Sequence, residues 1–164
     1  SIYSQCKEFI PAEWNKSIEH GIVELIKAID SKYKVFFEKN SAVKLIHSSA
    51  LTRGEVKTWV ETPMLLCSVG HFFLESIISF AKKLDLTCTL NVKLEKGFFL
   101  IVNFSKIERK ILMSLRIFAE ELNTMINVHS SETENSIEFI LCLVYSELEI
   151  PHYLEEKLTS KKQK

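Results

Sequence analysis

Glycine and proline are scarce in this chain, with 4 Gly and 3 Pro among 164 residues. Phosphate loops such as G-x-x-x-x-G-K need several glycines at fixed spacing, and the sequence contains no such loop. The nucleophile motif G-x-S-x-G and the zinc-protease motif H-E-x-x-H are also missing from it. This composition predicts a few long, closely joined elements in a single domain, residues 1–150, and no linked modules.

Neither sign of charge is in excess, because 21 Lys and Arg balance 21 Asp and Glu. We therefore expect no nucleic-acid partner and no anionic membrane partner. The basic C-terminal tail, 151–164, carries Lys157, Lys161, Lys162 and Lys164, and we interpret it as a solubilising terminus. No charged-then-apolar leader and no apolar run near 18 residues is found, so we expect a soluble protein. The chain begins at Ser1, and we expect it to be part of something longer.

Cysteine and histidine occur, but not at the spacings of a metal site. Cys6, Cys67, Cys88 and Cys142 are far apart and form no C-x-x-C pair, which predicts buried free thiols in a reducing, intracellular compartment such as the cytoplasm. The histidines are equally scattered, so we predict no metal. They are His20, His47, His71, His129 and His152.

Cys67 and His71 are four residues apart on a predicted helix, a spacing at which a thiolate and a base can meet. A buried thiol beside a partly exposed imidazole is the interpretation we favour. We accordingly predict no catalytic residue at this place.

Apolar residues at steps of three and four predict three helices and a weak fourth. The first lies at about 12–39 within an N-terminal helical segment, 1–40. The second begins at Pro63, which suits a first helical turn, and the third covers 107–125. A weak helix follows Pro151.

Alternating or continuous apolar runs predict strands between these helices, at 42–47, 56–60, 87–94, 98–104, 126–129 and 137–145. The order of elements predicts an α/β two-layer sandwich. Its sheet would be mixed, mostly antiparallel and five- to six-stranded, with about three helices on one face and a long N-terminal helix.

From about residue 17 to 145 this order resembles the ATP-binding domain of sensor histidine kinases, the GHKL or Bergerat fold. In that family a strand ends in Asp-Pro, and the next helix carries Asn-Leu-Leu-x-Asn-Ala-Ile-Lys-Phe. Here Thr62-Pro63 leads, without a gap, to Phe72-Phe73-Leu74-Glu75-Ser76-Ile77-Ile78-Ser79-Phe80. The resemblance implies a GHKL-like sandwich over 42–145.

The resemblance also implies where a nucleotide would bind, and those positions have changed. Phe72 and Ser76 replace the two asparagines that hold the metal and triphosphate, and neither side chain can supply a carboxamide. The strand that should end in Asp-x-Gly-x-Gly ends around Asn103 without glycine, and the loop that would close over ATP is missing. We therefore expect a pseudo-kinase domain that binds neither ATP nor another cofactor.

Nucleotide-free domains of this kind are similar to the second domain of certain bacterial histidine phosphotransferases, which dock response regulators and dimerise through a helical hairpin. This implies a non-catalytic protein-protein interaction or signalling adaptor domain, with a possible homodimer through the N-terminal helix. The expected interface is Trp14, Ile18 and Ile22, because large apolar side chains at one end of a helix make good anchors. Burial of the same stripe in the core is the alternative.

Two other functions stay open. His20 could be the phospho-acceptor of a histidine phosphotransfer intermediate that docks a response regulator. However, Glu19-His20-Gly21 lacks the acidic residue that follows the acceptor in the kinase motif. Alternatively, the chain could be an RWD-like structural adaptor of a larger complex.

Overall fold

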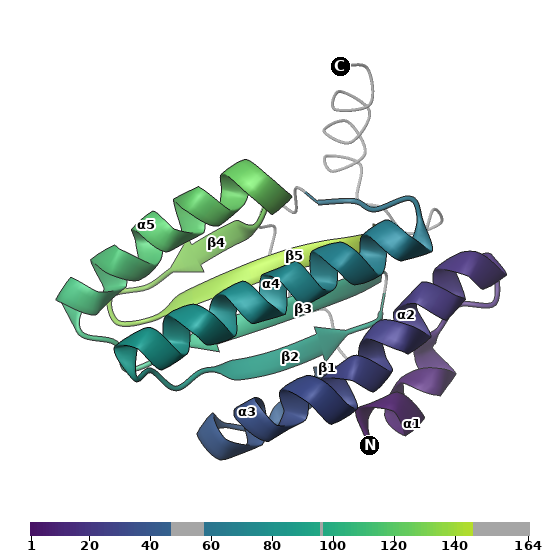
Figure 1. Ribbon diagram of the computed structural model, residues 1–164, viewed down its shortest axis with the longest axis horizontal. Coiled ribbons are helices and arrows are strands. Elements are labelled where there is room, and N and C mark those ends of the chain that lie inside the picture. Colours follow the sequence, from purple (N-terminus) through teal and green to yellow (C-terminus); the bar gives the residue numbers. More distant parts are fainter. Residues whose placement is uncertain (47–57, 96, 146–164) are drawn as a thin grey trace.

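The computed structural model describes residues 1–46, 58–95 and 97–145 (Figure 1). These residues form one mixed five-stranded sheet with helices packed on it, which confirms the predicted α/β class. The predicted helix after Pro151 and the basic tail lie outside the described residues.

The sheet has the strand order β1-β2-β3-β5-β4. Its strands are β1 Val43–Ile46, β2 Thr89–Lys93, β3 Gly97–Phe104, β4 His129–Glu132 and β5 Ile137–Tyr145. β1 runs parallel to β2, and the other neighbouring pairs are antiparallel, as predicted for a mostly antiparallel sheet. The long strands β3 and β5 lie next to each other inside the sheet, and nearly all of their residues are buried.

The helices divide the chain differently from the prediction. They are α1 Ile2–Cys6, a 3-10 turn Lys7–Phe9, α2 Lys16–Ala28, a π-helical turn Ile29–Tyr33, α3 Lys34–Asn40, α4 Pro63–Leu84 and α5 Arg109–Ile126. The bounds of α4 and α5 agree closely with the predicted helices. The single long N-terminal helix and the total of about three helices do not match this structure.

The N-terminal segment differs because local hydrogen bonds subdivide it. The Asn15 side chain accepts a hydrogen bond from Ile18 N at 2.8 Å, so α2 begins at Lys16 and not near residue 12. Asp30, within the π-helical turn, accepts hydrogen bonds from the backbone N–H groups of Ile2 and Tyr3 at 2.9 and 2.7 Å. The turn thereby fixes the start of α1.

Two predicted strands also need correction. Of the predicted strand 56–60, residues 58–60 are described and form no strand, although Val60 N donates a hydrogen bond to Leu143 O at 3.0 Å. The strand predicted at 126–129 lies instead at His129–Glu132, because α5 continues to Ile126 and Asn127 ends it with a left-handed backbone, φ 50°.

Side chains on alternate positions of the sheet enter two separate apolar clusters. On β3, Phe98, Leu100, Val102 and Phe104 belong to the main core, which lies between the sheet and α4 and α5 (Figure 1). The main core also includes the buried faces of α2 and the π-helical turn. The intervening β3 residues point to the opposite face of the sheet and form a second cluster with β5; its buried members are Phe99, Ile101, Ile140, Cys142 and Tyr145.

α2 packs against α4 at two glycines. A Cβ atom on Gly21 would lie 2.9 Å from Pro63 Cα, and one on Gly70 would lie 2.4 Å from Leu25 Cδ2. The missing side chains therefore allow the two helices to approach closely, which is the physical reason for a glycine inside α2.

Among the described helices, α4 has the length and composition that could cross a membrane, with a mean hydropathy of 1.6 over its most apolar window. The length and composition of α4 differ from the expectation that no apolar run approaches 18 residues. Core helices of soluble proteins meet the same criterion, and α4 buries residues such as Leu66, Phe73 and Ile77 in the main core.

Candidate functional site

Of the positions that would hold a nucleotide in the resembled family, two are neighbours on α4 and the third lies elsewhere, on β3. Phe72 is 40% exposed on α4, and Ser76 lies half-buried one turn later. Asn103 alternates with the core-facing Val102 and Phe104, so its side chain lies on the opposite face of the sheet. There it pairs in register with Glu138, whose pKa is raised by burial and held back by a hydrogen bond from Asn103.

The connection from β3 to α5 leaves little room for a nucleotide-covering loop. Only residues 105–108 join the two elements, and Lys106 has a left-handed backbone with φ 55°. The rings of Phe80 on α4 and Phe118 on α5 stack with centroids 4.3 Å apart. A hollow of about 280 Å³ next to these rings also includes Ile117 and Glu121.

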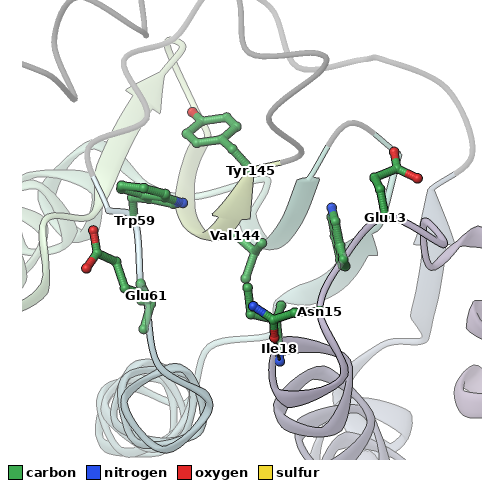
Figure 2. A pocket seen from close by; sticks show the side chains of 9 residues that line it. Glu13, Asn15, Ile18, Trp59, Glu61, Val144 and Tyr145 are labelled. Atoms are coloured by element: carbon green, nitrogen blue, oxygen red, sulfur yellow. Dashed lines mark hydrogen bonds between the residues drawn. The ribbon is translucent and has the colours of Figure 1, made fainter.

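A larger pocket of about 350 Å³ lies where three distant parts of the chain meet (Figure 2). The start of α2 forms one side, the segment 58–61 that leads into α4 forms another, and the end of β5 completes it. In Figure 2, Trp59 and Glu61 stand across the hollow from Glu13 and Asn15. The described lining residues are Glu13, Trp14, Asn15, Ile18, Trp59, Val60, Glu61, Val144 and Tyr145.

The walls of this pocket combine aromatic rings with carboxylates. Both tryptophans of the whole chain line it, together with Tyr145. Glu13 and Glu61 are exposed acidic residues in the lining, and the described lining contains no Lys or Arg. Trp14 is only 8% exposed, and its buried indole Nε1 has no hydrogen-bond partner among the described residues. A concave site lined by aromatic rings suits a ligand or a partner side chain that has apolar area.

The predicted interface residues are placed partly in the core and partly at this pocket. Trp14 and Ile22 are 8% and 0% exposed and belong to the main core. For these two residues the alternative, burial of the apolar stripe in the core, is the one found. Ile18 is half-buried, and with Trp14 it lines the pocket. The stripe of α2 is therefore used mainly inside the protein, and only its first turns reach the candidate site.

A second group of polar side chains joins the π-helical turn to α4. The buried Tyr33 hydroxyl lies 2.5 Å from His71 Nδ1 and donates to Glu75 Oε1 at 3.2 Å, while Lys32 Nζ lies 2.7 Å from the same carboxylate oxygen. Burial and then Glu75 raise the pKa of Tyr33. Burial, followed by Lys32, lowers the pKa of His71, and the Lys32 ammonium lowers the pKa of Glu75.

The hydroxyl of Tyr33 has one proton, and Glu75 as a carboxylate can only accept it. The arrangement that satisfies both contacts has Tyr33 donating to Glu75 and His71 Nδ1–H donating to Tyr33. The cluster thus orders the imidazole and satisfies the buried hydroxyl.

Cys67 does not use His71 as a base. Its thiol donates to Gly21 O at 3.2 Å, and burial, followed by the charge of Glu24, raises its pKa. Because a raised pKa disfavours the thiolate, this pair is poorly suited to nucleophilic chemistry.

The other predicted residues are dispersed. His20 is exposed on α2 and His129 is half-buried on β4, whereas His47 and His152 lie outside the described residues. Cys6, Cys88 and Cys142 are buried free thiols, as predicted, and burial raises the pKa of Cys6 and Cys88 to about 12. In the described ranges, no three His, Cys, Asp or Glu side chains are grouped as metal ligands would be.

Sequence reasoning missed the pocket's second wall. Trp59, Glu61 and Tyr145 fall in or beside predicted strands, and no spacing rule connects them with the start of α2. The one available signal was the presence of a single tryptophan in each of the two segments. The sequence does not show that the fold brings these two side chains together.

Comparison of the chain with family models, with curated proteins and with solved structures finds no match.

Proposed function

We propose that this chain is a non-catalytic protein-protein interaction or signalling adaptor domain, a GHKL-like pseudo-kinase that does not bind ATP. The observation that carries the proposal is the aromatic pocket of about 350 Å³ between α2, residues 58–61 and β5. Rigid aromatic side chains in a concave site are typical anchors for a protein partner.

The former nucleotide positions support the non-catalytic part of this proposal. A half-exposed phenyl ring at Phe72 and a hydroxyl at Ser76 offer no carboxamide to a magnesium triphosphate. Asn103 faces away from both, and only four residues separate β3 from α5. The free thiols with raised pKa values agree with a reducing, cytoplasmic setting.

Partner capture with matched variants tests the docking role. The protein is immobilised as wild type, as Ile18→Ser and as Ile117→Ser, and captured proteins from the native source are compared quantitatively by mass spectrometry. Ile18 lines the pocket, whereas Ile117 lines the other hollow and is 57% exposed on α5. A partner should be captured by the wild type and by Ile117→Ser, and lost with Ile18→Ser.

The proposal is contradicted if all three proteins capture the same set, or if nothing is captured above an unrelated domain. Circular dichroism of each variant confirms that the fold is retained, so loss of capture reports on the pocket.

Phosphotransfer through His20 is the second candidate function, because His20 is exposed on α2, as a phosphoryl acceptor must be. A phosphorylated receiver domain should then label the wild type and leave His20→Ala unlabelled. An RWD-like structural role would instead give partner capture without any label.

A homodimer through the N-terminal helix also remains a proposal. Trp14 and Ile22 are buried within one chain, so a dimer would have to use the exposed side of α2. Sedimentation velocity separates the two states by mass.

A further inference from the structure

The exposed apolar side chains of this protein gather on two neighbouring helices. Of the seven large apolar side chains that are exposed in the described ranges, six lie on α4 and α5; they are Met64, Leu65, Phe72, Met113, Ile117 and Met125. Figure 1 shows α4 and α5 side by side over the sheet, running in opposite directions. Apolar side chains that gather on one exposed face mark a site of contact with another molecule.

The hollow of about 280 Å³ lies between these two helices, and the stacked rings of Phe80 and Phe118 belong to its lining. Ile117 stands at the rim of the hollow, because it lines the hollow and is still exposed. We call the surface around the hollow the α4–α5 face; it consists of Phe72, Lys83, Ile117, Glu121 and Met125.

Helical spacing places these residues in two stripes, one on each helix. Ile117, Glu121 and Met125 follow one another at steps of four, so they share one side of α5. Phe72 and Lys83 are about three turns apart and share one side of α4. Because Lys83, Ile117 and Glu121 all line the hollow, the two stripes border it from opposite sides.

The two stripes carry charges of opposite sign. The single acidic residue of α4, Glu75, pairs with Lys32 at 2.7 Å, so the stripe of α4 contributes the ammonium of Lys83. The stripe of α5 contributes the carboxylate of Glu121, with Glu120 exposed beside it. Among the described residues, neither Lys83 nor Glu121 takes part in an ion pair.

On this basis we propose that the α4–α5 face binds a second copy of this chain. A two-fold axis that runs along the hollow, parallel to the helices, places α4 of each copy against α5 of the other. Lys83 of one copy then meets Glu121 of the other, and the symmetry repeats this pair. Ile117 of each copy packs at the hollow of the other, and Phe72 packs near the Met125 side chain of the other copy.

Two properties favour a second copy over a different protein as the occupant. The opposite charges on α4 and α5 make the face complementary to itself when one copy is rotated onto the other. The chain also has 21 basic and 21 acidic side chains, so no net charge keeps two copies apart. This interface uses neither the aromatic pocket nor α2, and it therefore goes beyond the docking role and differs from a dimer through the N-terminal helix.

Sedimentation velocity of the intact chain, from micromolar to submillimolar concentration, tests the proposal. The wild type should reach twice the mass of one chain as its concentration rises. Ile117→Asp should weaken this association at least about tenfold, because it places a charge in the apolar centre of the interface. Val35→Asp is the matched control: Val35 is the seventh exposed apolar side chain, it lies on α3, and its replacement should leave the association unchanged.

Charge reversal tests the contact between the two copies. Lys83→Glu alone and Glu121→Lys alone should each weaken association at least about tenfold, because each homodimer would then contain two pairs of like charges. An equimolar mixture of these two variants should dimerise again, since each copy supplies the charge that the other needs. A pair formed within one chain would not be restored by mixing. Circular dichroism of every variant checks that the fold is retained.

A wild type that stays monomeric at submillimolar concentration overturns the proposal. A dimer that survives Ile117→Asp, or one that is lost with Val35→Asp, overturns the choice of the α4–α5 face. Failure of the mixed charge variants to associate overturns the two-fold arrangement. Loss of partner capture with Ile18→Ser reports on the aromatic pocket alone, so the docking function is supported or refuted separately from the dimer.

Discussion

Tyr33 shows how one side chain can determine local backbone geometry. Its ring is 1% exposed, and its hydroxyl needs partners because a buried polar group without them costs free energy. His71 and Glu75 on α4 provide these partners. Tyr33 is the last residue of the π-helical turn Ile29–Tyr33. Such turns are frequent at places where a specific side chain has to be positioned.

The lowered pKa of His71 predicts a pH dependence of stability. Protonation favours the unfolded chain, in which histidine titrates near its ordinary value, so the folded protein loses stability as the pH falls below about 6.5. Replacing His71 by Gln should make the fall in Tm between pH 7.5 and 5.5 shallower than in the wild type. The lowered pKa of Glu75 affects stability only in more acidic solution, below this range.

Thermal unfolding by circular dichroism at the two pH values measures this effect, with His20→Gln on the exposed side of α2 as the control. If the Tm of the wild type, of His71→Gln and of His20→Gln all fall by the same amount between pH 7.5 and 5.5, the interpretation of the Tyr33 cluster is wrong.

Thiol reactivity gives a second prediction for single residues. Cys6, Cys88 and Cys142 are buried with raised pKa values, so they should resist an aromatic disulfide reagent at pH 8 in the native protein. Cys67 is half-buried and should account for the slow labelling that remains, which Cys67→Ser should abolish. Rapid labelling of a thiol in the Cys67→Ser protein would show that the described core is not closed.

At the scale of elements, the close contact of α2 with α4 depends on Gly21. A methyl group there would meet the backbone of Pro63, which cannot turn aside as a flexible side chain can. Overpacking costs about 1–3 kcal/mol, and the better helix propensity of alanine returns about 1 kcal/mol. Gly21→Ala should therefore lower the free energy of unfolding by up to about 2 kcal/mol in urea denaturation.

Ser17→Ala, on an exposed position of the same helix, is the matched control and should change stability little. An increase in stability for Gly21→Ala would mean that α2 and α4 do not approach as closely as described.

The elements that the sequence predicted well are those in which one apolar pattern decides the structure. Pro63 with the Thr62 cap marks the start of α4, and the long apolar runs mark β3 and β5. The predicted bounds are wrong where contacts between distant parts of the chain determine where a helix or strand begins and ends. Asp30 caps a helix far away in the sequence, and Ile126 and Val128 are apolar residues buried at a helix end and in a connection, not in a strand.

At the scale of the whole molecule, the candidate site could be predicted only in part. Trp14 and Ile18 were identified from their place near the start of a helix, and both do line the pocket. Trp59, Glu61 and Tyr145 complete it from segments more than 40 residues away, and single-sequence patterns contain no information on that contact. The absence of carboxamide side chains at Phe72 and Ser76 can be read directly from the sequence, because it depends only on residue identity at fixed positions.

If this domain works without nucleotide, as we propose, ATP should not stabilise it. The most direct test is thermal unfolding of the intact chain with and without Mg-ATP. A ligand that binds the folded state stabilises it by about 2.7 kcal/mol when present at one hundred times its dissociation constant. We predict the same Tm at all concentrations up to several millimolar. A saturable rise in Tm that requires both magnesium and ATP would contradict the account.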